Sequence, residues 1–262
     1  VAGERLQLPG EAMNGPVNTT VAWLTFRQLF TRNRLIAAAL FAAAPLVITL
    51  FFSATAHTHD PTGVQFLREL YSGVIAFVLL PLAAVVFGTA AFGGEIDDGT
   101  IVYLLVKSLP RWKLVLSKYV VAVLSTFVMM SVAVILPWLA LGAPADSAPV
   151  VEGFTAGIAL GAALYCAIFL TMGLMSKRAL VLGLLYIVVI EIALSPNVQG
   201  LKSLSVREFV MTVVGKIAAG APGIKAGAVT TNTVWTMGAI FLVGALGLGI
   251  RWLQRYELAE RL

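Results

Sequence analysis

Six runs of apolar residues divide the chain, and polar or charged residues separate them. The runs cover roughly residues 35–53, 70–92, 119–142, 154–175, 179–195 and 234–253. A helix of about 20 apolar residues is long enough to cross the hydrocarbon core of a bilayer. The pattern therefore predicts an all-α, polytopic membrane protein with six transmembrane helices, which form one domain over residues 35–262.

Residues 18–34, ahead of the first run, follow a different pattern, in which apolar and polar positions form two faces at helical spacing. The apolar face holds Ala22, Trp23, Phe26, Leu29 and Phe30, and the polar face holds Arg27, Gln28, Thr31 and Arg34. Aromatic residues opposite arginines are typical of a helix that lies in the membrane interface. We expect residues 1–34 to be a cytoplasmic tail ending in such a helix; the alternative is that this helix is the polar start of the first span.

Composition supports the membrane assignment. Hydrophobic residues make up 59% of the chain and charged residues 12%, and the mean hydropathy is +0.93. Ordinary soluble domains carry about 25% charged residues. One soluble core of this length cannot bury so much apolar surface, so the bilayer must solvate most of it. The single cysteine, Cys166, lies inside an apolar run, which excludes disulfides and thiolate metal clusters within the chain.

The distribution of basic residues predicts the orientation. If the N-terminus is cytoplasmic, the inner segments hold 13 of the 18 lysines and arginines, and the outer segments hold 5. Because Lys and Arg concentrate on the cytoplasmic side, both termini are predicted to be cytoplasmic. The net charge is +5, and the basic residues cluster at the ends of the apolar runs. This position indicates contact with lipid headgroups rather than with nucleic acid. The composition of the spans fits a bacterial inner membrane, and no signal peptide is recognisable.

The outer segment 196–233 contains a further helix pattern. Ser205 and Glu208 form an S-x-x-E capping box, and an apolar face follows them. Gly220 and Pro222 are expected to stop the helix. Since it is too short and too charged for a seventh span, we expect it to lie on the outer leaflet or dip into it.

The loop between the second and third runs carries the most informative pattern. Three carboxylates, Glu95, Asp97 and Asp98, precede a short apolar stretch, and Pro110 is placed to start the next helix. Acidic residues stabilise a helix N-terminus by about 0.3–1 kcal/mol each. We therefore expect a short helix lying crosswise at the cytoplasmic face, with Leu104 and Leu105 available to dock a partner.

The same residues carry a resemblance to a known family. The pattern consists of Glu95, Gly99-Thr100, Leu104-Leu105, Pro110, Arg111 and the basic Lys118. Together with the six runs and the interfacial helix, it resembles the permease subunits of ABC transporters of the type-2 exporter class, over essentially the whole chain. The resemblance implies that residues 95–109 are the coupling helix, which seats on a separate ATPase subunit. The implied coupling residues are Glu95, Asp97, Asp98, Gly99, Thr100, Leu104, Leu105, Pro110 and Arg111. The alternative is an ordinary solvated loop.

The chain has no P-loop of its own, because that motif needs Gly-x-x-x-x-Gly-Lys-Ser/Thr and the nearest approach is Gly215-Lys216 followed by Ile217. We expect a non-catalytic subunit without a cofactor, whose partner ATPase binds ATP and Mg. The resemblance implies two ATPase subunits and a second permease subunit, identical or homologous. Drug-like molecules, lipids and lipid-linked polymers all remain open as substrates. The rival functions are an ion-driven secondary transporter and a non-transporting membrane scaffold or intramembrane enzyme.

Three further features each have two interpretations. Glu191 is the only carboxylate deep inside a run, where charge is costly. Either it lies on the substrate path or gate, or it sits in the outer third of the fifth span, where it snorkels or pairs with a polar neighbour. His57 and His59 form an H-x-H, but metal binding needs more ligands, so we predict no metal site. Glycines at four-residue spacing in the fourth run, and at looser spacing in the sixth, allow close helix packing, within the subunit by preference or between subunits otherwise.

Overall fold

The computed structural model describes residues 19–29, 32–55, 62–97, 110–176, 178–194, 199–219 and 227–260. Over these ranges the chain forms helices and short connections, with no strand. The α-helices are α1 (Thr19–Leu29), α2 (Arg32–Thr55), α3 (Gly63–Glu69), α4 (Leu80–Asp97), α6 (Arg111–Ala140), α7 (Ala148–Met175), α8 (Ala179–Tyr186), α9 (Val206–Ile217) and α10 (Thr231–Glu260). Two π-helical stretches, η2 (Leu70–Leu79) and η4 (Ile187–Leu194), and two 3₁₀ stretches, η3 (Ala145–Ser147) and η5 (Gln199–Leu204), complete the order. The predicted all-α class is confirmed.

Four helical stretches among the described residues are long and apolar enough to cross a membrane. They are Gly63–Gly93, Arg111–Ala140, Ala145–Met175 and Thr231–Gln254. Two shorter apolar helices, Ala39–Thr55 and Ala179–Ala193, coincide with the first and fifth runs of the sequence. All six runs are therefore helical where the structure describes them, apart from the turn at Leu141 and Gly142, and the count of six spans stays a prediction.

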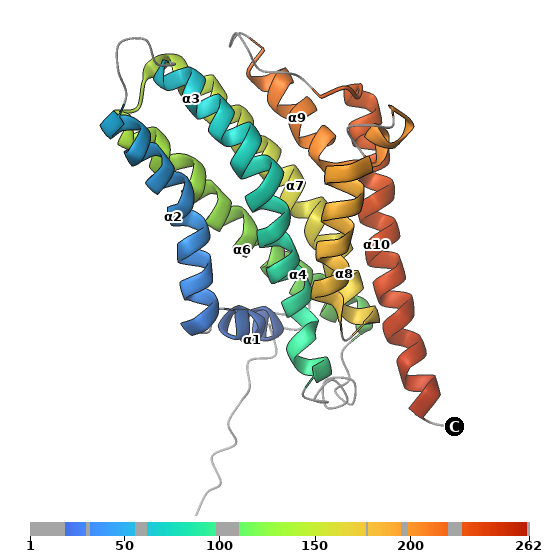
Figure 1. Ribbon diagram of the computed structural model, residues 1–262. Helices are drawn as coiled ribbons and strands as arrows, with labels where there is room; N and C mark the ends of the chain where they lie inside the picture. Colours follow the sequence, from blue (N-terminus) through green and yellow to red (C-terminus); the bar gives the residue numbers. More distant parts are fainter. Residues whose placement is uncertain are drawn as a thin grey trace, which may run out of the picture.

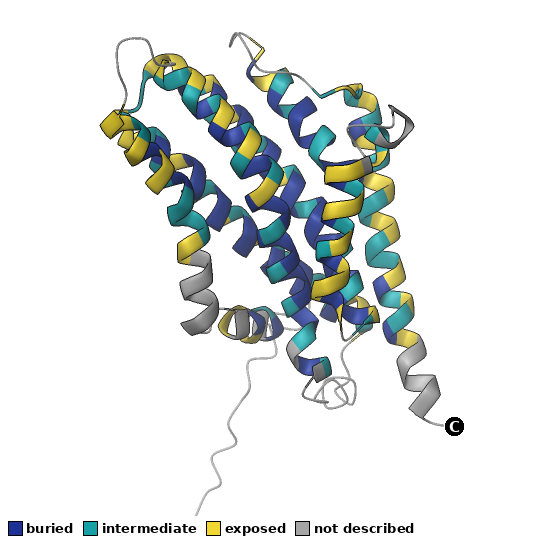
Figure 2. Ribbon diagram, in the orientation of Figure 1, coloured by how far each residue is buried: buried dark blue, intermediate teal, exposed yellow. Residues whose placement is uncertain are grey.

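Helix α7 lies at the centre of the bundle, in contact with α4, α6, α9 and α10. Its buried residues run along almost its whole length, whereas α2, α8 and α10 turn exposed faces outward (Figure 2). Those outward faces carry large apolar side chains, such as Val47, Val181 and Val243. Apolar residues on the outside as well as the inside are expected where lipid rather than water surrounds the helices.

The N-terminal helix α1 lies across the foot of α2 (Figure 1). It buries Val21 and Thr25 against its neighbours and exposes Trp23 and Phe26, whose rings stack with 6.0 Å between centroids. An exposed aromatic face on a crosswise helix suits the membrane interface. The helix is shorter than the predicted 18–34, because it ends at Leu29 and the next helix, α2, already begins at Arg32.

The glycines of the fourth run form the face of α7 that receives α9. A Cβ atom on Gly157 would lie 2.9 Å from Cγ2 of Val214 and 3.0 Å from Cγ1 of Val210. Gly153 and Gly161, one turn to either side, also face α9. The preferred interpretation, packing within the subunit, is confirmed for this stripe. Helix α9 thus packs beside α7, and whether segment 196–233 lies on the outer leaflet or dips into it stays a prediction.

The glycines of the sixth run behave differently. A Cβ on Gly238 would reach Leu164 at 3.8 Å, but at Gly244 and Gly247 it would meet nothing within 4 Å in the described part of the chain. Tight packing within the subunit therefore does not explain these last two glycines.

Candidate coupling site

The loop singled out by the sequence is flanked by α4 and α6, which pack against each other. Helix α4 ends at Asp97, and α6 begins at Arg111 with Pro110 as its N-cap. Proline fits a helix start because it lacks the N–H that would otherwise be unsatisfied there. The two helices therefore hold both ends of segment 98–109 at one end of the bundle.

A buried ion pair joins these helices. Nζ of Lys118 lies 2.5 Å from Oε2 of Glu95, and only 1% and 7% of the two residues are exposed. The same Nζ donates a second hydrogen bond to the carbonyl oxygen of Ala91 at 2.6 Å, and it lies 4.5 Å from the ring centroid of Phe92. An ammonium so well enclosed needs these partners, because burying a charge without compensation is costly.

The geometry of the pair links the two sides of the loop. Glu95 belongs to the last turn of α4, and Lys118 lies two turns into α6. A displacement of one helix against the other near segment 98–109 would stretch or break a contact shorter than 3 Å. The pair therefore joins α4 to α6 close to both ends of segment 98–109.

The other predicted coupling residues are placed as follows. Asp97 is the last residue of α4, Pro110 is exposed at the start of α6, and Arg111 is half-buried in its first turn. The remaining predicted residues, Asp98, Gly99, Thr100, Leu104 and Leu105, lie outside the described residues. Glu95 and Asp97 are thus part of a spanning helix, whereas the sequence pattern placed them at the start of the coupling helix.

Glu191 lies at a second buried polar cluster, on the π-helical stretch η4 and 1% exposed. Its carboxylate accepts hydrogen bonds from the Tyr165 hydroxyl at 2.9 Å, the Ser205 hydroxyl at 2.6 Å and the Val206 backbone N–H at 3.1 Å. Ser205 is the N-cap of α9, so the carboxylate sits at the N-terminus of that helix, where its charge is favoured. Glu191 thereby ties η4 and α7 to α9.

Only one of the two hydrogen bonds of the predicted capping box at α9 is present. The Ser205 hydroxyl accepts from the backbone N–H of Glu208 at 3.3 Å, as expected. The Glu208 carboxylate instead accepts from the N–H of Ala228 at 2.9 Å, which joins α9 to the chain ahead of α10. Sequence reasoning recognised Ser205 as a cap but missed its bond to Glu191, because nothing local to either residue encodes a contact between them.

No group of three His, Cys, Asp or Glu residues that could hold a metal ion occurs within the described ranges. His57 and His59 lie outside them. Cys166 is fully buried, with its sulfur 3.3 Å from Oγ1 of Thr126.

These features define a polytopic α-helical membrane protein in which a buried ion pair joins the two helices that flank the loop. A family model described as "ABC-2 family transporter protein" matches residues 30–194, and the chain belongs to this family. The matched region begins just before α2 and ends with η4, so it includes the loop, Lys118 and Glu191 but not α9 or α10. A search of curated protein sequences finds no match to the chain.

Proposed function

We propose that this chain is the transmembrane permease subunit of an ATP-driven exporter, with six spans and both termini in the cytoplasm. Segment 98–109 seats on a separate ATPase subunit, and two such ATPases serve a pair of permeases. The ATPases bind ATP and Mg and supply the free energy. The substrate path runs between the permeases, and drug-like molecules, lipids and lipid-linked polymers are all substrates to be tried.

One observation carries the proposal: the Glu95–Lys118 ion pair joins the two helices that flank the segment whose sequence resembles a coupling helix, and this segment lies within the residues that the family model matches. A coupling element must transmit the displacement of a docked partner to the spans. A flexible loop between the partner and the spans would absorb that displacement. Alternating access is a two-state equilibrium, and a ligand shifts it only by binding one state better than the other. A rigid clamp beside the docking segment meets that requirement, because it makes α4 and α6 move together.

The proposal is tested by co-purifying the ATPase with variants of the segment. Each buried leucine contributes about 1.5–3 kcal/mol, and 1.4 kcal/mol is a tenfold change in affinity. The double variant Leu104→Ala/Leu105→Ala should therefore lose the ATPase by tenfold or more, and Gly99→Trp should block close approach. Glu95→Ala should keep the ATPase bound but uncouple ATP hydrolysis from transport.

The matched control replaces two leucines elsewhere, Leu139 and Leu248, which are both exposed on spanning helices. The variant Leu139→Ala/Leu248→Ala should retain the ATPase at the wild-type level. If all three segment variants also retain both the ATPase and transport, segment 98–109 is not the coupling element.

A further inference from the structure

Arg207, in the first turn of α9, is a half-buried cation that forms no ion pair with any residue the structure describes. Its Cζ atom lies over the ring of Phe77 on η2, 4.4 Å from the ring centroid. Contact with an aromatic ring uses the face of a guanidinium, whereas its five N–H donors point outward in its plane. One of them, on Nε, is buried without a hydrogen-bond partner among the described residues. The side chain is therefore fixed by its face while its donors remain to be used.

The contact lies near the middle of the helices that are long enough to cross a membrane. Phe77 is close to the midpoint of the 31-residue stretch Gly63–Gly93. Val210, one turn further along α9, lies against Gly161, where an added Cβ would be 2.8 Å from Cγ2 of Val210. Gly161 is itself close to the midpoint of the 31-residue stretch Ala145–Met175. A charged group at such a depth is costly in hydrocarbon, and charges inside membrane proteins commonly mark the path of a substrate or ion.

The carboxylates near Arg207 have other partners. Glu191 accepts from the Ser205 hydroxyl at 2.6 Å and from the Val206 N–H at 3.1 Å. Glu208 accepts from a backbone N–H in the chain ahead of α10. Ser205 and Val206 directly precede Arg207, so the bonds to Glu191 fix the first turn of α9 and with it the position of the guanidinium. The cation is held in place without being neutralised by either acid.

The surface around the guanidinium is apolar and open on the side of η2. Val78, the neighbour of Phe77, is 40% exposed. Gly73, one turn earlier, is also exposed, and a Cβ added there would meet nothing within 4 Å in the described part of the chain. The planar fork of an arginine matches the two oxygens of a carboxylate or phosphate. The arrangement therefore suits a ligand that combines one acidic group with an apolar body.

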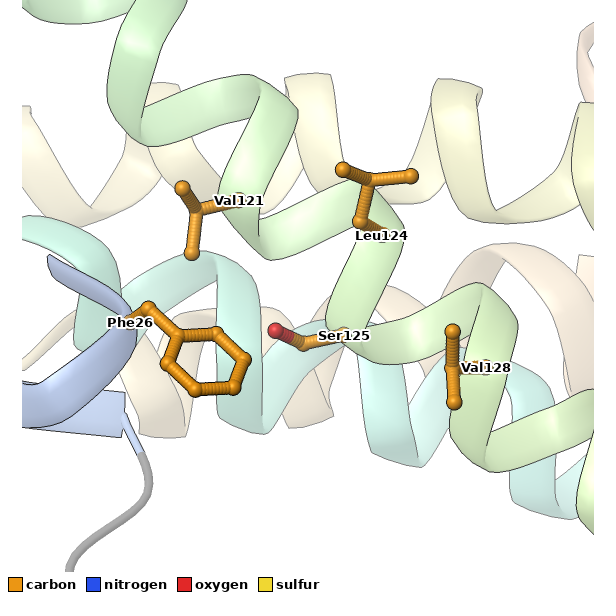
Figure 3. Close-up of a pocket in the computed structure, with 5 residues that line it drawn as sticks. All are labelled: Phe26, Val121, Leu124, Ser125 and Val128. Atoms are coloured by element: carbon orange, nitrogen blue, oxygen red, sulfur yellow. The ribbon is translucent and has the colours of Figure 1, made fainter. Parts of the chain in front are cut away.

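The groove between α1 and α6 shows what such a site is not. It has a volume of about 330 Å³ and is lined by Phe26, Val121, Leu124, Ser125 and Val128 (Figure 3). Its surface is entirely apolar, because the one polar residue, Ser125, is only 5% exposed. This groove has no group that would distinguish an acid from a neutral molecule, and so it provides an internal reference for contact with lipid chains.

We propose that Arg207 binds the acidic group, a carboxylate or phosphate, of an amphiphilic substrate at the middle of the translocation path. Phe77 holds the guanidinium, and the exposed residues of η2 contact the apolar body of the substrate. The inference rests on the proposed function, since it assigns the site to the path of the exporter. Among the substrates to be tried, it selects those that carry an acidic group.

The test uses the purified chain in phosphatidylcholine nanodiscs, without an ATPase, at a pH that ionises fatty acids. The probe is palmitic acid with a diazirine in its chain near the carboxyl group, and its methyl ester is the neutral reference. After photolysis, mass spectrometry should find the acid in excess over the ester on residues 73–78 and 206–210. Both probes should label residues 121–128, in the apolar groove, equally.

Competition measures the charge preference and identifies its source. Unlabelled palmitic acid should displace the acid probe about ten- to hundredfold better than methyl palmitate, which is the ratio expected for a hydrogen bond to a charged group. Displacement by phosphatidic acid, beyond that by phosphatidylcholine, would extend the site to the phosphate of a lipid. Without it, the ligand is a carboxylate.

Substitutions assign the preference to Arg207. Arg207→Gln should reduce labelling by the acid to the level of the ester, and Arg207→Lys, which keeps the charge, should retain part of the excess. Lys216→Gln, at an exposed lysine further along α9, is the matched control and should behave like the wild-type chain. Hydrogen exchange over residues 206–217 shows whether α9 stays folded in each variant.

Two results would overturn the inference. One is equal labelling of residues 73–78 and 206–210 by the acid and the ester in the wild-type chain, which needs no variant. The other is an excess of the acid that Arg207→Gln leaves intact. Either result would leave the docking of the ATPase at segment 98–109 untouched, because no ATPase is present in this experiment.

Discussion

Lys118 on α6 and Glu95 on α4 form a buried ion pair with 2.5 Å between Nζ and Oε2, and the two helices that they join are the ones that hold segment 98–109. Under the proposed function, a docked ATPase would act on the spans beside this pair. Substitutions can measure the contribution of the pair to stability separately from its contribution to transport.

Breaking the pair should destabilise the protein strongly. Lys118→Met leaves the Glu95 carboxylate buried without its cation, and removing one partner of a buried pair costs about 3–5 kcal/mol. We expect a clear drop in the thermal unfolding midpoint in detergent. The double variant Glu95→Gln/Lys118→Met should recover much of the loss, because no unpaired charge remains. Lys216→Met, which removes an exposed lysine on α9, is the control and should change the midpoint little. Equal midpoints for Lys118→Met and this control would show that the pair does not hold α4 and α6 together.

Glu191 should fix α9 on the bundle. Glu191→Ala removes the acceptor for Tyr165, Ser205 and the Val206 N–H at once. We expect faster hydrogen exchange over residues 206–217, and slower transport if α9 contributes to the path. Glu152→Gln, at an exposed position on α7, should leave exchange unaltered. Transport that fails while exchange over α9 stays at the wild-type rate would instead assign Glu191 a direct part in the path or gate.

A side chain added at Gly157 should destabilise the contact between α7 and α9. A leucine at Gly157 would meet Val210 and Val214 at distances shorter than van der Waals contact, and overpacking of this kind costs about 1–3 kcal/mol. Gly157→Leu should therefore lower the unfolding midpoint and loosen α9. Gly244→Ala is the control, because its Cβ meets nothing within 4 Å and alanine favours a helix over glycine by about 1 kcal/mol. A midpoint unchanged by Gly157→Leu would contradict the close packing described here.

The predicted orientation can be checked with reporters. Reporters placed at Thr19 and after Leu262 should both be found in the cytoplasm, and one at Thr58 should be found outside, because the basic residues concentrate on the inner segments. Termini on opposite sides would break the six-span topology.

The sequence predicted the helices well because a span must be both apolar and about 20 residues long, and few other structures satisfy both conditions. Contacts between helices were harder to predict from the sequence. Lys118 was recognised as part of the motif, but its pairing with Glu95 depends on how α4 and α6 cross, which no local pattern contains. The glycine stripe predicted close packing, yet only the structure identifies α9 as its partner. Glu191 was left with two interpretations, since its partners Tyr165 and Ser205 are 26 and 14 residues away.

The central claim, that segment 98–109 docks a separate ATPase, is tested most directly by photo-cross-linking from Leu104 in native membranes. A photoreactive amino acid at position 104 should cross-link to a polypeptide whose peptides contain Gly-x-x-x-x-Gly-Lys-Ser/Thr, and the same amino acid at Leu139 should not. Cross-links from position 104 to lipid alone, or to the same proteins as from position 139, would contradict the account.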